Sequence, residues 1–279
     1  MREESGRLET SDGHELFWRS WEPEAPKAVL VFVHGLGEHS GRYGRTASHF
    51  SERGFACCAV DLRGHGASEG RRVHVNRFDE YLVDVDAVLA LGRSRHPGLP
   101  AFLVGHSMGG LITLRYLLAR PDAVRGAVVS SPLLGFNPTA DASTITKLVG
   151  RLLSVLAPRT LFPNGLDVTA LSRDTAVVGA YAADPLVSNK VSARWYISTS
   201  RAMAEARARA PALQVPVLLM QSGADRLVDG EATRRWARAA PEGLVRFVWW
   251  DGLFHEMFNE PERETVFARV DAWLDEQLK

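Results

Sequence analysis

The chain has 279 residues, of which 46% are hydrophobic and 24% are charged, so its composition is that of a folded globular protein and excludes a disordered one. Its 33 Lys and Arg balance its 33 Asp and Glu, which argues against a dedicated nucleic-acid binder, because such proteins usually carry a basic excess. No apolar run reaches the roughly 18 residues of a membrane-spanning helix, and the N-terminus lacks the apolar core of a signal peptide, so we expect a cytoplasmic protein.

Short apolar runs alternate with amphipathic stretches along most of the chain. Residues 8–21, with Asp12-Gly13 in the middle, predict a hairpin. Buried strands are then predicted at 28–33, 55–60, 101–104, 127–129, 217–220 and 245–250. Helices are predicted at 79–93, 111–120, 231–239 and 261–278, the last with Asn259 as its N-cap and Pro261 in its first turn. This alternation indicates an α/β fold with a mostly parallel sheet covered by helices on both faces.

The alternation breaks once, because residues 133–200 contain no convincing buried strand. An apolar stripe at helical spacing runs through this segment at Ile145, Leu148, Val149, Leu152, Leu153 and Leu156. We therefore expect an insertion at 133–200 between two strands of a core formed by 1–132 and 201–279.

The two cysteines, Cys57 and Cys58, are neighbours within a predicted strand. Consecutive Cα atoms lie about 3.8 Å apart, whereas a disulfide needs about 4.4–6.8 Å. We expect two small buried strand residues and no bridge between them.

A candidate nucleophile follows the predicted strand 101–104. Gly105-His106-Ser107-Met108-Gly109 fits G-x-S-x-G between that strand and a helix, which is the setting of a nucleophile elbow. The turn exposes the hydroxyl of Ser107, and the glycines leave room for the turn. The alternative is a serine that merely caps a helix.

Attack on an ester carbonyl creates an oxyanion, which must meet preorganised N–H donors. The N–H of Met108, directly after the nucleophile, is one candidate, and the N–H of Leu36, in the loop after strand 28–33, is the second. The side chain of Leu36 would line the acyl pocket. The alternative for His34-Gly35 is a simple strand-ending turn.

A serine nucleophile needs a general base. Of the 9 histidines, only His255 lies C-terminal to Ser107, where the order Ser, acid, His requires it. The acid should follow the preceding strand, which favours Asp225. Asp229 is expected to be a helix N-cap, and Asp251 shares the loop of His255, so both are less favoured. His34, His65 and His106 are expected to satisfy loop backbone groups. The sequence has no metal-ligand spacing and no G-x-G-x-x-G that opens a helix, so we predict neither metal nor cofactor.

Several motifs together resemble the monoacylglycerol lipase and lysophospholipase-like family of α/β-hydrolases over about residues 10–275. The matching stretches are His34 to Tyr43 (HGLGEHSGRY), Asp61 to Gly70 (DLRGHGASEG), Gly105 to Gly110 (GHSMGG), Asp184-Pro185-Leu186 and Phe254-His255-Glu256. The resemblance implies the α/β-hydrolase fold with a mainly helical lid at 133–200, no cofactor, and acylglycerols as substrates.

The resemblance also implies that Glu38 and Arg42 shape the glycerol side of the site. Their spacing of four residues equally allows a plain ion pair, and both can hold. Two departures from the family concern head-group recognition: Leu36 is branched, and Phe258 stands where some members place a second histidine.

The segment 143–160 carries Lys147, Arg151 and Arg159 and no acidic residue. Such a segment suits an interfacial helix on anionic lipid, which would give peripheral membrane contact through the lid. The alternative is a lid helix whose apolar stripe simply faces the acyl tunnel.

The sequence thus predicts a serine ester hydrolase that cleaves monoacylglycerol through an acyl-enzyme on Ser107, with no nucleic-acid partner and with no prediction of oligomeric state. A lysophospholipase or broad carboxylesterase with the same triad is the nearest alternative. A non-catalytic relative that acts as a binding protein is the alternative from another class.

Overall fold

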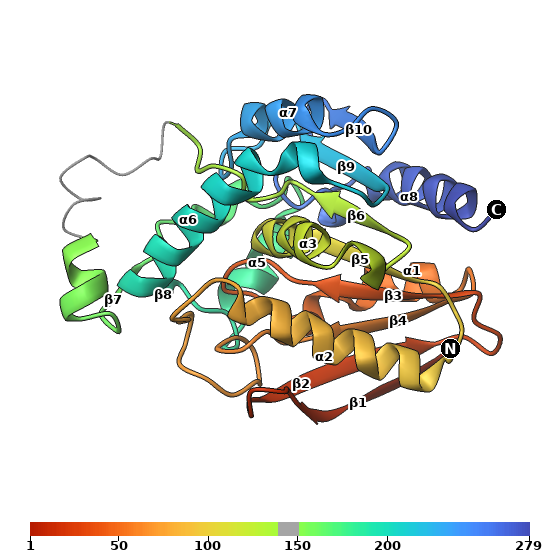
Figure 1. Ribbon diagram of the computed structural model, residues 1–279, viewed down its shortest axis with the longest axis horizontal. Helices are drawn as coiled ribbons and strands as arrows, with labels where there is room; N and C mark the ends of the chain where they lie inside the picture. Colours follow the sequence, from red (N-terminus) through yellow and green to blue (C-terminus); the bar gives the residue numbers. More distant parts are fainter. Residues whose placement is uncertain (139–150) are drawn as a thin grey trace.

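The computed structural model describes residues 1–138 and 151–279, which form a layered α/β structure around an 8-stranded sheet (Figure 1). The strand order is β1-β2-β4-β3-β5-β6-β9-β10. The strands are β1 (Arg2–Glu9), β2 (Glu15–Glu22), β3 (Ala28–Val33), β4 (Phe55–Val60), β5 (Ala101–His106), β6 (Gly126–Ser130), β9 (Val217–Ser222) and β10 (Val245–Trp250).

The sheet is parallel from β4 to β10, and β2 of the N-terminal hairpin is the strand that runs against this direction. β1 pairs antiparallel with β2, which pairs antiparallel with β4. β3 pairs with β4 on one side and with β5 on the other, so the chain continues from β3 to β4 and then crosses to the opposite side of β3 to form β5. The carboxyl ends of β3 and β5 therefore flank the point where the strand order reverses, which is where open α/β sheets usually bind their ligands.

Two helical layers cover the sheet, because successive strand side chains point to opposite faces. Val29, Val31 and Val33 of β3 belong to one buried cluster, with α2 (Glu80–Arg95) and α3 (Met108–Ala119). Leu30 and Phe32 face the other cluster, with α1 (Gly44–Ser51) and α8 (Arg263–Gln277). Figure 1 shows α2 and α3 crossing in front of the sheet.

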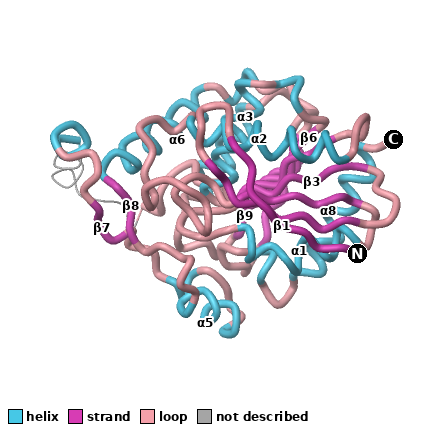
Figure 2. Tube along the Cα trace, turned by 90° about the horizontal axis from the view of Figure 1, so that it is seen from below, coloured by secondary structure: helices cyan, strands magenta, loops and turns pink. Residues whose placement is uncertain are grey.

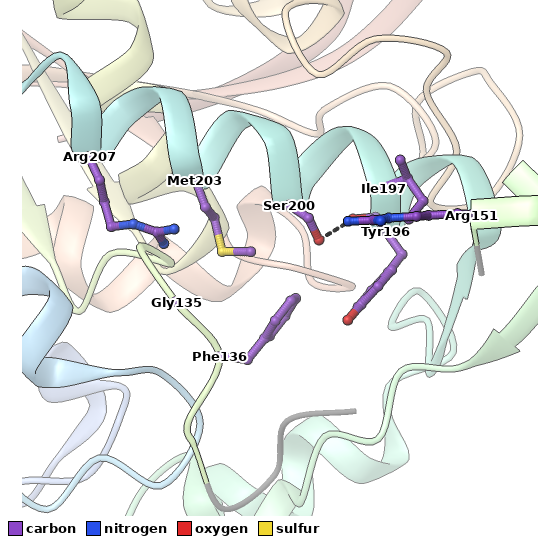
Figure 3. Close-up of a pocket in the computed structure, with 8 residues that line it drawn as sticks. All are labelled: Gly135, Phe136, Arg151, Tyr196, Ile197, Ser200, Met203 and Arg207. Carbon is purple, nitrogen blue, oxygen red and sulfur yellow. Dashed lines mark hydrogen bonds between the residues drawn. The ribbon is translucent and has the colours of Figure 1, made fainter. Parts of the chain in front are cut away.

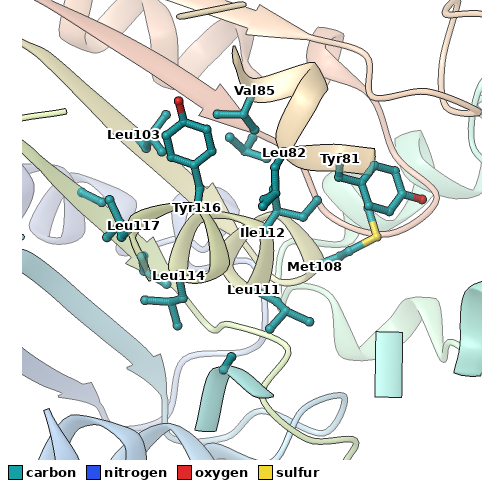
Figure 4. Close-up of a cluster of buried hydrophobic side chains, with 14 of the residues drawn as sticks. Tyr81, Leu82, Val85, Leu103, Met108, Leu111, Ile112, Leu114, Tyr116 and Leu117 are labelled. Atoms are coloured by element: carbon teal, nitrogen blue, oxygen red, sulfur yellow. The ribbon is translucent and has the colours of Figure 1, made fainter. Parts of the chain in front are cut away.

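The nucleophile helix α3 is buried on all sides, which explains why its sequence has no polar stripe. Ile112 and Tyr116 lie on the side of α3 that faces Leu82 and Val85 of α2, whereas Leu111 and Leu114 point to the opposite side (Figure 4). An apolar helix held in this way gives the turn before it a rigid base.

The segment between β6 and β9 departs from the core. It contains the short antiparallel pair β7 (Leu161–Pro163) and β8 (Lys190–Ser192), with α5 (Thr175–Ala183) between them and α6 (Ala193–Ala208) after them. Figures 1 and 2 both place β7 and β8 beyond one end of the main sheet, away from the two termini. The predicted boundary at residue 200 falls inside α6, whose Trp195, Ala202 and Met203 join the core cluster.

Helix α7 (Gly230–Ala239) matches its prediction, and Asp229 caps it by accepting the N–H of Ala232 at 3.1 Å. The predicted start of the last helix is wrong: α8 begins at Arg263, and Asn259 belongs to a short 3-10 turn instead of capping it. Cys57 and Cys58 are free and buried in opposite core clusters. Within the described part of the chain, no helix combines the length and apolarity needed to cross a membrane.

Candidate active site

Ser107 occupies the sharp turn between β5 and α3, where its backbone has φ 54° and ψ −117°. Residues other than glycine rarely adopt these backbone angles, so the surrounding structure must hold Ser107 in this conformation. The N–H of Ser107 donates to the carbonyl of Ser130 at 3.0 Å, and its own carbonyl accepts the N–H groups of Leu111 at 3.1 Å and Leu133 at 2.9 Å. β6 and the start of α3 thus impose the strained conformation.

The two glycines of the motif are required by close backbone packing. A Cβ on Gly109 would lie 1.9 Å from the carbonyl oxygen of Val33, and one on Gly105 would lie 2.5 Å from the carbonyl oxygen of Gly109. Both distances are far below van der Waals contact. Only glycine therefore lets the start of α3 sit against the end of β3.

His255 and Asp225 face each other across the loops that follow β10 and β9. The Nδ1 of His255 lies 2.7 Å from Oδ2 of Asp225, and both side chains are buried. The other carboxylate oxygen, Oδ1, accepts the N–H groups of Leu227 at 2.8 Å and Val228 at 3.1 Å. Asp225 is therefore fixed by its own loop and can orient the imidazole so that Nε2 is left for a reacting proton.

The electrostatics of this pair suit a general base and its supporting acid. Burial alone would lower the pKa of His255, but the charge and the hydrogen bond of Asp225, together with the charges of Glu256 and Glu38, raise it. Burial alone would raise the pKa of Asp225, but the charge and hydrogen bond of His255 lower it. Each partner thus stabilises the charged form of the other.

The two rival acids are engaged elsewhere. Asp229 caps α7, and Asp251 accepts a hydrogen bond from Nε1 of Trp249 at 3.0 Å. Neither has a hydrogen bond to His255 among the described residues.

His106, directly before Ser107, packs against His255 with ring centroids 4.7 Å apart. Burial, followed by the neighbouring His255, lowers the pKa of His106 to about 4, so this ring is neutral near pH 7. This contact brings the loop after β10 to the elbow. His34 serves its loop as expected, accepting the N–H of Leu62 at 2.9 Å on Nε2.

The predicted oxyanion donors lie on the two loops that meet at the strand-order reversal. Among the hydrogen bonds between described residues, none is donated by the backbone N–H of Leu36 or Met108. The N–H of Gly35, by contrast, is occupied by Oε1 of Glu38 at 2.6 Å. A Cβ on Gly35 would lie 3.3 Å from Cβ of Ser107, which shows how closely this loop approaches the elbow.

Glu38 and Arg42 form the ion pair that their spacing allows, with 2.5 Å between Oε2 and Nη1. The sequence did not indicate the second partner, Glu256, whose carboxylate binds Arg42 through two bonds of 2.6 and 2.7 Å. Tyr181 of α5 lies against the same guanidinium, 4.6 Å from ring centroid to Cζ. The only sequence signal for Glu256 was its place directly after His255.

A small cavity of about 10 Å³ adjoins this ion-pair cluster, with room for about one water molecule. Its lining residues come from the loop after β3, the elbow and the loop after β10: Glu38, Arg42, Tyr43, Thr46, His106, Glu256, Phe258 and Asn259. Phe258 stacks on Phe267 of α8 and so brings an apolar face to this cavity.

A larger cavity of about 290 Å³ lies between α6 and the segment after β6 (Figure 3). Phe136, Ile197 and Met203 contribute apolar surface, and Arg151 and Arg207 contribute charge. The segment that lines it starts close to the elbow, since the N–H of Leu133 donates to the Ser107 carbonyl.

Residues 151–156, the described end of the predicted lid helix, are helical and present apolar side chains to solvent. Leu152 is 59% exposed, Val155 70% and Leu156 72%. Leu153 of the predicted stripe is half-buried, and Ile145, Leu148 and Val149 of the stripe, with Lys147, lie outside the described residues. No group of His, Cys, Asp and Glu side chains within 1–138 and 151–279 is arranged to hold a metal ion.

The chain is similar to known proteins along most of its length. The family model described as serine aminopeptidase S33 matches residues 24–262. The chain is 35% identical to phospholipase YtpA of Bacillus subtilis, over 93% of this chain and 99% of that protein. It is 35% identical to the monoacylglycerol lipase of Mycolicibacterium smegmatis, over 95% of each. The crystal structure of a Paleococcus ferrophilus monoacylglycerol lipase superposes with a TM-score of 0.85 at 33% identity, covering 94% of this chain and 99% of that one.

Proposed function

This chain belongs to the monoacylglycerol lipase and lysophospholipase-like family of α/β-hydrolases and is a carboxylic ester hydrolase, and on that premise we propose that it cleaves monoacylglycerol to a free fatty acid and glycerol. The observation that carries this proposal is the ring contact between His106 and His255, which relates the strained Ser107 turn to the buried His255–Asp225 pair. The relatives named monoacylglycerol lipase support the choice of substrate.

In the proposed reaction, Oγ of Ser107 attacks the ester carbonyl carbon while Nε2 of His255 takes the hydroxyl proton. The carbonyl oxygen becomes an oxyanion, which the N–H groups of Leu36 and Met108 stabilise. The C–O bond to glycerol then breaks, and His255 returns its proton to the leaving glycerol oxygen. Asp225 stabilises the imidazolium in between.

The acyl-enzyme on Ser107 is then hydrolysed by the same groups. Water attacks the acyl carbon as His255 takes one of its protons, and that proton returns to Oγ of Ser107 when the fatty acid leaves. The cavity between α6 and the segment after β6 supports a role in holding the acyl chain, because Phe136, Ile197 and Met203 line it and that segment begins with Leu133, which is hydrogen-bonded to Ser107. Its volume of about 290 Å³ is at the lower end for ligand sites.

The charge beside the elbow favours a glycerol leaving group over a phosphate-bearing one. Glu38 and Glu256 bring two carboxylates against the single guanidinium of Arg42. A lysophospholipid places a phosphate next to the ester, and like charges at short distance repel in a buried site. Arg42 has two of its nitrogens engaged by these carboxylates, so it offers little capacity for a phosphate.

The test compares kcat/KM of one enzyme preparation for four substrates: monoacylglycerol, lysophosphatidylcholine, lysophosphatidylglycerol and a short p-nitrophenyl ester. We expect monoacylglycerol to be preferred over both lysophospholipids. A preference for a lysophospholipid would replace the proposal with the lysophospholipase alternative. If a fluorophosphonate failed to label Ser107, the chain would be a non-catalytic relative.

We also propose that the insertion 133–200 acts as a lid that contacts a membrane surface. The exposed Leu152, Val155 and Leu156 support an apolar contact with lipid. Arg151, Arg194 and Arg201 line one hollow together with Val155, Arg159 follows in the sequence, and residues 151–166 contain no acidic residue. This charge suits a surface that contains anionic lipid.

Co-sedimentation with phosphatidylcholine vesicles, with and without phosphatidylglycerol, tests the lid contact. We expect the anionic lipid to increase binding, Arg151→Glu to reduce it, and Val155→Ser with Leu156→Ser to weaken binding to both vesicle types. Arg45→Glu on α1 is the matched control, since Arg45 is also exposed but lies outside the insertion. Unchanged binding of both lid variants would refute the contact.

A further inference from the structure

The guanidinium of Arg42 joins two loops that are far apart in the sequence. Its Nη1 and Nη2 lie 2.6 and 2.7 Å from the carboxylate oxygens of Glu256, and Nη1 lies 2.5 Å from Oε2 of Glu38. All three side chains are nearly excluded from solvent, with 11% of Arg42 and 4% of each glutamate exposed. A bidentate pair of this kind fixes both distance and orientation.

One end of this set of contacts reaches the loop after β3 that carries Leu36, here called the oxyanion loop. Glu38 uses its second oxygen, Oε1, to accept the N–H of Gly35 at 2.6 Å and the hydroxyl of Tyr43 at 3.0 Å. Gly35 immediately precedes Leu36, the candidate oxyanion donor. A displacement of Glu38 therefore changes the backbone on which that donor sits.

The other end is attached to the loop of the general base. Glu256 directly follows His255, and its carboxylate also accepts Nδ2 of Asn259 at 2.9 Å. The backbone N–H of Glu256 donates to the carbonyl of Leu171 at 2.8 Å. Gly35, Glu38, Arg42 and Glu256 thus form one continuous connection from the oxyanion loop to the residue beside the imidazole.

The same connection places negative charge close to the imidazole. Two carboxylates face one guanidinium, so the cluster carries a net negative charge when all three groups are ionised. The titratable and charged groups around His255 come from the loops after β9, β3 and β10 and from the elbow, and they are Asp225, Glu38, Arg42, Glu256 and His106. Burial and Asp225 have the largest effects on the pKa of His255. Glu256 and then Glu38 come next, and both raise that pKa.

We propose that Glu256 is a positioning residue which, through Arg42, holds the loop of His255 at a fixed distance from the oxyanion loop and keeps negative charge beside the imidazole. This inference rests on the proposed roles of Ser107 and His255. Glu256 does not itself touch the reacting atoms. Its removal affects the geometry of the base and donor together, and small misplacements of such groups reduce rates strongly.

The experiment measures the rate at which a fluorophosphonate labels Ser107, and kcat for monoacylglycerol, from about pH 5 to 9. Glu256→Gln keeps the shape of the side chain and removes its charge. We expect about a 10- to 100-fold loss of the labelling rate and of kcat with little change in KM. The acidic limb of the pH profile should also move to lower pH, because a lost negative charge lowers the pKa of a neighbouring histidine.

Glu256→Asp separates charge from geometry, because it keeps the carboxylate and shortens its reach. We expect its acidic limb to stay at the wild-type pH while its rate falls. Glu264→Gln is the matched control, since Glu264 is 73% exposed on α8 and should behave as the wild type. Thermal unfolding of each variant shows whether the fold persists.

The outcomes distinguish this inference from the proposed function. A wild-type enzyme that the fluorophosphonate does not label overturns the role of Ser107. A labelled wild type together with a Glu256→Gln variant of equal rate and equal pH profile overturns the positioning role alone. If neither Glu256 variant folds, Glu256 serves the stability of the fold, and the positioning role is also wrong.

Discussion

Nδ1 of His255 lies 2.7 Å from Oδ2 of Asp225, although these residues are 30 positions apart in the sequence. β9 and β10 are neighbouring parallel strands, so the loops that follow them leave the sheet at the same edge. The contact is therefore a direct consequence of strand order. It brings a carboxylate and an imidazole together without either belonging to a regular element.

Removing the three side chains of the proposed triad should affect the rate unequally. We expect Ser107→Ala and His255→Ala each to lower kcat by about 10⁵- to 10⁶-fold, and Asp225→Asn by about 10⁴-fold, because Asp225 acts only through His255. Steady-state kinetics with monoacylglycerol measures these losses. The double variant Ser107→Ala/His255→Ala should lose little more than either single variant, and additive losses would contradict a shared mechanism.

The pH dependence of the rate should follow the titration of His255. The imidazole must be neutral to accept a proton, and Asp225 raises its pKa, so the acidic limb of kcat/KM should lie above the usual histidine value of about 6.5. Asp225→Asn removes the negative charge and should move that limb to lower pH. A limb that stays in place in Asp225→Asn would assign the titration to another group.

Two glycine-to-alanine substitutions should have opposite effects on stability. A Cβ on Gly109 would lie 1.9 Å from the Val33 carbonyl oxygen, so Gly109→Ala should abolish activity and prevent normal folding. Gly179 is a residue of α5 with no atom near an added Cβ. Gly179→Ala should therefore stabilise the protein by about 0.5–1 kcal/mol. Chemical denaturation measures both, and a tolerated Gly109→Ala would show that the elbow can shift.

Glu38 should make stability depend on pH in the acidic range. The charges around Glu38, foremost Arg42, overcome its burial and lower its pKa to about 2, below the ordinary value near 4.5. A carboxylate with a lowered folded-state pKa stabilises the fold above pH 4.5 and loses that contribution as the pH falls toward about 2.

Glu38→Gln should therefore cost about 3 kcal/mol near neutral pH, the effect of breaking a buried pair. The difference from the wild type should shrink steadily as the pH is lowered, as measured by urea unfolding at each pH. A constant difference would mean that Glu38 contributes through packing alone.

The elements of the core were predictable because their signals are local. The β-branched run at 28–33, the G-x-S-x-G turn and the capping residue Asp229 each depend on neighbours in the chain. The incorrect start of α8 has the opposite origin. Asn259 has the residue type of an N-cap, but its amide donates to Glu256, so a contact of the site overrides its local preference.

The insertion could be outlined but not oriented from sequence. The apolar stripe indicated a helix with one apolar face, and both an inward and an outward direction satisfied that pattern. In the described part, Leu152 and Leu156 of the stripe are exposed, together with Val155, whereas Leu153 is half-buried. A period of 3.6 residues defines a face, whereas only the neighbouring elements determine what the face meets.

The sequence by itself determined the strand–turn–helix setting of Ser107 and the chain order in which an acid and a histidine follow it. It also allowed the ion pair of Glu38 with Arg42 on the assumption of a helical segment, whereas in the structure Glu38 precedes the short turn Ser40–Tyr43 and still reaches Arg42. Only the tertiary structure decided that Glu256, 214 positions away, takes the other side of that guanidinium. Such a contact leaves no periodic pattern in the chain, because it exists only once the ends of β3 and β10 lie at the same edge of one sheet.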